Sequence, residues 1–137
     1  MIDGARLVYE VLTSDSDLVA ETGGSIYGPP GLPAGFTLKK AVMFYGDGGD
    51  ESTQLPVVEQ TFTFHCYGET SAQARRVYSV LSDALWRKAG ENVTVNSETW
   101  RLIFTWHGGG PYDLVEPELG WPYVRVSYIL RFIREAM

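Results

Sequence analysis

Two segments in which apolar and polar residues alternate constrain the possible folds of this chain most. Successive side chains of a β-strand point to opposite faces, so strict alternation predicts a strand with one face on a core. The segment from Val57 to Tyr67 alternates in this way, and so does the longer segment from Tyr123 to Ile133. The predicted inward faces are Phe62, Phe64 and Cys66 in the first segment, and Val124, Val126, Tyr128, Leu130 and Phe132 in the second.

Two segments with helical periodicity flank the first of these strands. Residues Asp3 to Thr13 carry apolar side chains at helical spacing, and Asp3 can cap the start. After the strand, Thr70 to Gln73 match a capping box that opens a helix ending near Gly90. The order of helix, strands, helix, strands predicts an α+β fold, with a largely antiparallel sheet and two main helices packed on one face.

The remaining segments are shorter. Asp15 and Asp17 can cap a short second helical turn, which Gly23 and Gly24 end, and Ser25–Tyr27 is extended. Loops are predicted for residues 28–35, 46–51 and 108–119, because glycine and proline dominate them. A strand is predicted from Ala41 to Tyr45, and a hairpin turns around Asn96, Ser97 and Glu98. Its second strand would place four residues on one face: Trp100, Leu102, Phe104 and Trp106.

Length and composition fit one domain over residues 1–137. Cys66 is the only cysteine, so no disulfide within the chain is possible. We expect no signal peptide, because the N-terminus has no basic region followed by an apolar run. We expect no membrane span, because no apolar run approaches about 20 residues, and we expect synthesis in the cytoplasm. The predicted core is formed by Leu7, Val11, Phe62, Phe64, Val77, Leu81, Leu102, Phe104, Val126, Tyr128 and Leu130.

Charge is unevenly distributed along the chain. The net charge is −6; residues 1–70 contain ten acidic and three basic side chains, and residues 71–137 contain seven and eight. A protein that wraps DNA needs clustered Lys and Arg, so the acidic half argues against that function. DNA could still pass nearby without binding.

The residues with the most reactive chemistry do not form a recognisable catalytic or metal site. His65 and Cys66 are neighbours on a strand, so their side chains diverge, and Cys66 shares its face with Phe62 and Phe64. The two histidines and one cysteine are too scattered for a structural zinc site. We therefore expect no catalytic residues, no cofactor and no metal.

Three loop motifs favour flexible or solvated loops over binding sites. The glycine run 108–110 lacks the lysine and following helix of a phosphate loop. The acidic run 46–51 lacks calcium-loop spacing. Glu116 and Glu118 are paired carboxylates, but acid–base catalysis needs one of them in a cleft, which sequence does not reveal.

The order of these features is typical of a known family. The N-terminal helix runs into Ser14-Asp15-Ser16-Asp17-Leu18-Val19; Ser25-Ile26-Tyr27-Gly28, a Pro-rich loop and a strand follow. Then come Phe62-Thr63-Phe64-His65-Cys66-Tyr67-Gly68, a helix with Ala72-Gln73-Ala74-Arg75, and the closing strand. Over nearly the whole chain this pattern resembles the tail terminator (tail completion) proteins of long-tailed bacteriophages. Gly28 stands where the family pattern has proline, and the 108–119 loop is long.

The resemblance implies a structural virion protein of the tail without enzymatic activity. It implies a homo-oligomeric ring, hexameric in the family, that caps the tail tube, stops its polymerisation and contacts the head–tail connector protein. DNA would pass through the ring without specific binding. From the residues themselves, long strands offer edges for pairing between subunits, and aromatic residues beside a Pro–Gly loop suit a protein contact. The candidate interface or lumen residues are Asp47, Asp50, Glu51, Tyr112, Asp113, Glu116, Glu118, Trp121 and Tyr123.

Two alternatives remain open at the level of sequence. One is another virion function on the same topology, such as a head–tail connector or a minor tail subunit. The other is a small enzyme or ligand-binding domain with residues 108–119 as a lid. For the acidic segment 46–51 there are likewise two hypotheses: it lines the channel and repels DNA, or it contacts the next subunit or solvent.

Overall fold

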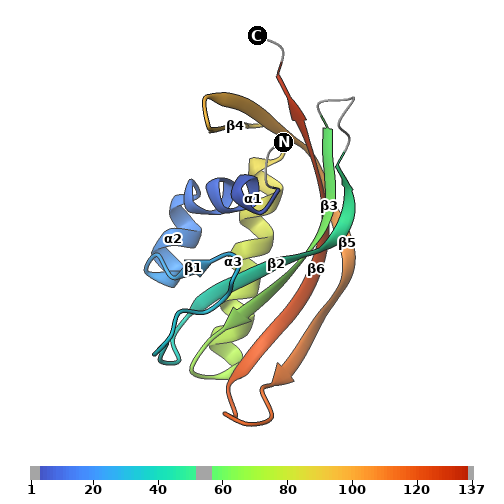
Figure 1. The fold of residues 1–137 in the computed structure, drawn as a ribbon. Coiled ribbons are helices and arrows are strands. Elements are labelled where there is room, and N and C mark those ends of the chain that lie inside the picture. The colour runs from blue at the N-terminus through green and yellow to red at the C-terminus, as the bar shows by residue number, and fades with distance from the viewer. Residues whose placement is uncertain (1–3, 52–56, 136–137) are drawn as a thin grey trace.

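The computed structural model describes residues 4–51 and 57–135, and only the backbone of residues 47–51 and 104. Within these residues it contains three helices and six strands (Figure 1). In chain order they are α1 (Gly4–Thr13), α2 (Ser16–Thr22), β1 (Ile26–Tyr27), β2 (Ala41–Glu51), β3 (Val57–Tyr67), α3 (Ser71–Lys88), β4 (Asn92–Val95), β5 (Glu98–Val115) and β6 (Pro122–Arg134).

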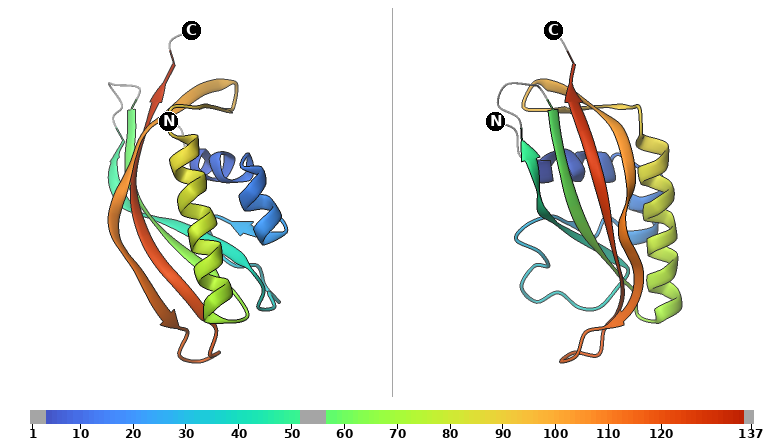
Figure 2. Two further views of the ribbon diagram at one scale, coloured as in Figure 1. Left: turned by 180° about the vertical axis from the view of Figure 1, so that it is seen from behind. Right: turned by 90° about the vertical axis from the view of Figure 1, so that its right-hand side faces the viewer.

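The six strands form one sheet in the order β1-β2-β3-β6-β5-β4. All neighbouring strands are antiparallel except β1 and β2, which pair in parallel over two residues. The three helices lie together on one face of the curved sheet, as the two views in Figure 2 show. The predicted α+β fold with a largely antiparallel sheet is confirmed.

The start of α3 follows directly from its sequence. Thr70 accepts a hydrogen bond from the backbone N–H of Gln73, and the Gln73 side chain accepts one from the N–H of Glu69. The first bond satisfies a donor that the first turn leaves free, and the second ties the residue before the N-cap to the helix, in a variant of the capping box. Gly90 follows the helix with a φ of 90°, a conformation that a side chain would disfavour. The helix buries Ala74, Val77, Leu81, Ala84 and Leu85.

A buried aspartate joins α2 to α3. Asp15 precedes α2, and its carboxylate accepts a hydrogen bond from the N–H of Leu18. The same carboxylate contacts the guanidinium of Arg87, near the end of α3, at 3.0 Å. One side chain therefore caps one helix and ties it to the next.

The core lies between the helices and the inward face of the sheet. All residues of the predicted core whose side chains are described are buried, from Leu7 and Val11 in α1 to Leu130 in β6. Phe104 is the exception, because its side chain lies outside the described residues. The predicted inward faces of β3 and β6 are confirmed, and register pairs Phe62 with Tyr128 across them.

Two predicted loops are wrong, because they lie within strands. Residues 46–51 continue β2 and pair with β3 as far as Val58, with a bulge between Gly46 and Gly48. Residues 108–115 likewise continue β5, paired with β6 through irregularities near Gly109 and Tyr112. Glycine lowers the intrinsic preference for a strand, but the neighbouring strand supplies the hydrogen bonds, and the bulges accommodate the extra residues. Only residues 116–121 connect β5 to β6.

The predicted shared face of the β5 aromatics is also wrong. Trp100 and Leu102 point to the core, as predicted. The register with β6 shifts between Leu102 and Phe104, so that Trp106 pairs with the outward-facing Ile129. A bulge inserts one residue and moves every later side chain to the other face. The hairpin itself is confirmed, and Asn96 and Ser97 form its turn with positive φ angles.

Candidate interaction surfaces

The face of the sheet that points away from the helices is the most prominent candidate surface (Figure 2). We call it the bare face. The register of the four long strands assigns its side chains row by row, because directly paired residues point to the same side. It comprises Met43, Tyr45, Glu59, Thr61, Thr63, His65, Tyr67, Trp106, Tyr112, Leu114, Tyr123, Arg125, Ser127, Ile129 and Arg131.

Aromatic rings gather at one end of the bare face. Tyr67 lies 5.6 Å from Tyr123 and 6.4 Å from both Phe36 and Trp121, measured between ring centroids. The imidazole of His65 stacks on Tyr123 at 4.9 Å, with an angle of 16° between the planes. We call these five residues the aromatic cluster. Trp121 and Tyr123 are half-buried in it, rather than freely exposed as their loop context predicted.

The environment of the cluster fixes the protonation of its central tyrosine. Tyr67 is only 6% exposed, and desolvation together with the nearby Tyr123, Glu116 and Tyr45 raises its pKa to about 12. The hydroxyl therefore stays protonated at neutral pH. It shares a hydrogen bond with Nδ1 of His65, whose Nε2 lies 3.4 Å from the hydroxyl of Tyr45. The rings are held by these polar contacts as well as by stacking.

His65 and Cys66 do not form a nucleophile and its base. His65 lies on the bare face among tyrosines, whereas the Cys66 thiol is fully buried in the core. Burial raises the pKa of the thiol well above its usual range, so it remains a neutral S–H. The predicted divergence of the two side chains and the burial of Cys66 are confirmed.

A hollow of about 400 Å³ opens in the middle of the bare face. Thr63 and Ser127 form part of its lining, and their hydroxyls lie 3.0 Å apart. Tyr45, Tyr112 and Arg125 also line it. Gly109 also lines the hollow but contributes no side chain to it. The guanidinium of Arg125 lies 5.6 Å from the centre of the Tyr112 ring. The lining is hydroxylic and aromatic, with one positive charge.

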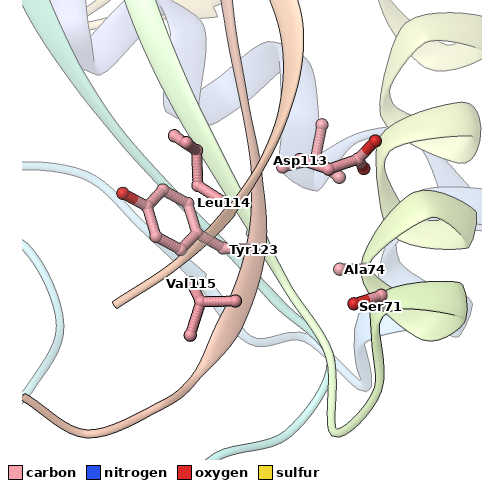
Figure 3. A pocket seen from close by; sticks show the side chains of 7 residues that line it. Ser71, Ala74, Asp113, Leu114, Val115 and Tyr123 are labelled. Carbon is pink, nitrogen blue, oxygen red and sulfur yellow. The ribbon is translucent and has the colours of Figure 1, made fainter. Parts of the chain in front are cut away.

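A smaller pocket, of about 80 Å³, lies where β5 and β6 approach the start of α3 (Figure 3). In this view the Asp113 carboxylate points toward the helix, whereas the Tyr123 ring lies on the other side of the strands. Asp113 forms an ion pair with Arg75 at 2.8 Å, and Ser71 and Ala74 complete the helix side. The ion pair links the end of β5 to the start of α3 at an exposed position.

A third depression, of about 460 Å³, lies between α2 and α3 on the far side of the helices. Its lining includes the acidic residues Asp17, Glu21 and Asp83 and the basic residues Arg76 and Arg87. The opposite charges face one another: Arg76 lies 3.4 Å from Glu21, and Arg87 lies 3.4 Å from Asp17. This arrangement links two helices and does not resemble a binding site for one sign of charge.

Both edges of the sheet are open over part of their length. β1 pairs with β2 only at Val42 and Met43. On the other side, β4 pairs with β5 as far as Arg101, and Leu102 bonds to the chain after α3. From Phe44 onward on β2, and from residue 103 onward on β5, no other strand of the described chain covers the edge. Such rows of free N–H and C=O groups can pair with another strand.

The predicted site residues separate into distant groups. Asp47, Asp50 and Glu51 lie at one end of the sheet, at the far end of β2. Glu116 and Glu118 lie at the other, in the β5–β6 connection, where Glu116 accepts a hydrogen bond from the N–H of Leu119 (Figure 1). The other predicted residues are in β5 or the aromatic cluster. The alternative in which residues 108–119 form a flexible lid is wrong, because residues 108–115 belong to β5 and pair with β6.

Sequence reasoning did not single out four residues of the bare face and the aromatic cluster as contact residues: Phe36, Tyr67, His65 and Arg125. Three of them could have been found from the outward positions of the alternating strands. The contribution of Phe36 could not, because it comes from a loop whose path sequence does not predict.

The described residues contain neither a candidate metal site nor a helix that could span a membrane. Among residues 4–51 and 57–135, no group of three or more His, Cys, Asp or Glu side chains is placed to hold a metal ion. In that same part of the chain, no helix is long and apolar enough to cross a membrane.

Comparison with known proteins gives similarity at the level of the fold. The sequence matches no family model and no curated protein. The structure is similar to a chain in the virion of a native gene transfer agent particle, with a TM-score of 0.63 and 17% identity, covering 93% of this chain and 92% of that one. It is also similar to the gp17 protein of bacteriophage SPP1, with a TM-score of 0.52 and 17% identity, covering 93% and 86%. At this identity the likeness establishes a shared fold over nearly the entire length of both chains.

Proposed function

We propose that this chain is a structural protein of a phage or phage-like virion, located in the tail. More specifically, it acts as a tail terminator: several copies form a ring that caps the tail tube and contacts the head–tail connector. The sequence pattern supports the family, and the two similar structures, a virion chain and a phage protein, support the setting.

The main support for the ring is the position of the two open edges, which lie at the two ends of the same row of paired residues. Tyr45 on β2 pairs with Thr63, Thr63 with Ser127, and Ser127 with Gly109 on β5. Both ends of this row lie in the open stretches. A closed ring needs each copy to be rotated relative to the next without a shift along the axis. Edges that open at the same level can meet under such a rotation.

The directions of the edge strands are also compatible. β2, β3, β6 and β5 alternate in direction, so β5 runs opposite to β2. When a second copy continues the sheet with its helices on the same side, its β2 meets β5 antiparallel. Antiparallel pairing is the commoner and slightly more stable arrangement.

The short strands mark where this contact would end. β1 covers β2 up to Met43, and β4 together with the segment after α3 covers β5 up to Leu102. The stretch between these covers runs from Phe44 to Asp50 on β2, about 20 Å at 3.3 Å per residue. Asp47 and Asp50 then lie at the junction between subunits and Glu51 lies at its end, which favours subunit contact over a purely channel-lining position.

The test is assembly on tails that lack a cap. Purified protein is mixed with tail tubes, and the tube ends are inspected by electron microscopy, with light scattering to measure the size of the free protein. We expect a ring, of six subunits by family resemblance, at one end of each tube. A protein that stays monomeric and never binds tube ends at any concentration would contradict the proposal. Binding to the connector but not to tubes would favour the alternative, a head–tail connector.

A further inference from the structure

We propose that the hollow on the bare face is a docking site for a carboxylate side chain of a partner protein, with Arg125 as its receptor. The site lies on a face that none of the three helices covers (Figure 2). The inference goes beyond the ring, because it is argued from the charge of Arg125 at the centre of the face, although Tyr45 and Gly109 at the rim of the hollow also lie on the two edge strands.

Arg125 differs from most basic side chains of this protein because it forms no ion pair within the described residues. Nine of the eleven Lys and Arg side chains form ion pairs with carboxylates: Arg6, Lys40, Arg75, Arg76, Arg87, Lys88, Arg101, Arg131 and Arg134. Among the described residues, Arg125 has no such partner, although the chain has 17 acidic residues. Lys39 also lacks one, but it lies in a loop beside Phe36. Arg125 is central on a sheet face, where its charge is available to a partner.

The guanidinium of Arg125 is held in place by its neighbours on the adjacent strands. Register places Arg125 directly between His65 on β3 and Tyr112 on β5. The guanidinium lies against the Tyr112 ring, and His65 is fixed by its stack on Tyr123. A planar guanidinium held against a ring keeps its fork of N–H donors available for a carboxylate. Less side-chain entropy is then lost on binding.

The surroundings of Arg125 are polar. The hydroxyls of Tyr45 and Tyr112, which line the hollow, can donate hydrogen bonds to carboxylate oxygens. The aromatic cluster continues from the hollow along the same face, and aromatic residues with arginine are the usual anchors of protein interfaces. The fitting partner is therefore a protein segment with Asp or Glu beside an apolar side chain.

Nucleic acid is the less suitable partner. A phosphate backbone is bound by several Lys or Arg side chains together. Here the two other arginines that register places on this side of the sheet are both paired: Arg131 with Glu59, and Arg101 with Glu135. One unpaired guanidinium beside apolar rings fits a single carboxylate better than a row of phosphates.

A peptide titration tests the site on the full chain. The probe is a capped pentapeptide whose only charge is a central glutamate between leucine and phenylalanine. Its binding is followed through the NMR signals of the Arg125 Nε–H group and of the Thr63 and Ser127 amides. We expect these signals to shift with saturation, and the same peptide with glutamine to bind roughly tenfold more weakly or worse, because the charge-assisted bond is lost.

Variants of Arg125 test whether its guanidinium binds the carboxylate directly. Arg125→Gln should abolish the preference for glutamate over glutamine, whereas Arg125→Lys should retain part of it, because the charge remains without the fork. Arg131→Gln is the matched control and should leave peptide binding unchanged. No shift up to the solubility limit, equal binding by Arg125→Gln, or stronger binding of a short oligonucleotide than of the peptide would overturn the inference. Because the titration needs no assembly, its failure leaves the ring proposal standing, and failed ring formation leaves this result standing.

Discussion

At the scale of single residues, the buried thiol shows how a reactive side chain can be purely structural. Cys66 lies on the inward face of β3, where Val42 and Val124 are its neighbours in register. Its thiol pKa is raised by burial, so the reactive thiolate is suppressed. We predict that Cys66→Ala lowers the free energy of unfolding by about 1 kcal/mol, toward the small end of core truncations. Native protein should resist labelling by a thiol reagent, and rapid labelling without denaturant would refute this assignment.

A second residue-scale prediction concerns the buried stripe of α3. Leu81 is fully buried against the sheet. Leu81→Ala should lower the free energy of unfolding by roughly 2–5 kcal/mol, because a cavity remains where the side chain was. Ser79→Ala on the exposed side of the same helix is the control, expected to stay within about 0.5 kcal/mol. Denaturant unfolding of both variants measures the difference, and similar values for the two would mean that the helix face is assigned wrongly.

A third prediction follows from the protonated hydroxyl of Tyr67. Its pKa is raised to about 12 in the folded protein, from an ordinary value near 10. The folded state therefore holds this proton more tightly than the unfolded chain. The resulting stability is complete below about pH 10 and is lost as the pH rises toward 12. Tyr67→Phe should make the alkaline loss of stability less steep, measured as the unfolding midpoint against pH; an unchanged slope would argue against it.

At the scale of elements, sequence predicted those whose local signals agree with their packing. The capping box of α3, the alternation of β3 and β6, and the turn at Asn96 all lie where the residues indicate. The errors are in β2 and β5, where glycine runs favour loops by themselves. Their strand structure comes from pairing with β3 and β6, which are distant in sequence, and a bulge near residue 103 reverses the faces. Local sequence propensity predicts neither the pairing with distant strands nor the position of the bulge.

The candidate surfaces were predictable to a similar extent. Sequence indicated aromatic contacts at Trp121 and Tyr123, and the aromatic cluster contains both. It did not reveal that Arg125 lies between His65 and Tyr112, because that row needs the register of three strands. The hollow also depends on Gly109, which local sequence assigned to a loop.

An element-scale prediction concerns the acidic end of β2. Residues 47–50 belong to the open edge that we propose for subunit contact. The double variant Asp47→Lys with Asp50→Lys reverses two charges there, so we expect assembly on tail tubes to be weakened while the monomer still folds. Electron microscopy of tubes and circular dichroism of the free protein provide the two readouts. Normal assembly with slowed genome ejection would instead place these carboxylates in the channel.

At the scale of the whole molecule, the ring contact and the docking site that we propose use different parts of one sheet. The helices cover one face of the sheet and build the core, and the other face stays available for a partner (Figure 2). The two edges open at the same level and run in opposite directions. A chain built in this way can extend its sheet from copy to copy, and the resulting heterologous contact closes into a ring when the rotation permits.

Intermolecular cross-linking between the two edges tests this account most directly. Tyr45→Cys and Gly109→Cys are introduced together in a Cys66→Ala background. A Cβ atom added at Gly109 would meet no heavy atom within 4 Å apart from its neighbours in the chain. Under mild oxidation of the assembled protein, we predict a ladder of disulfide-linked oligomers that ends at the ring. Tyr45→Cys combined with Ser79→Cys, on the exposed side of α3, is the control and should give no ladder. Rings that assemble normally with both edge cysteines, yet never cross-link through them, would contradict edge pairing.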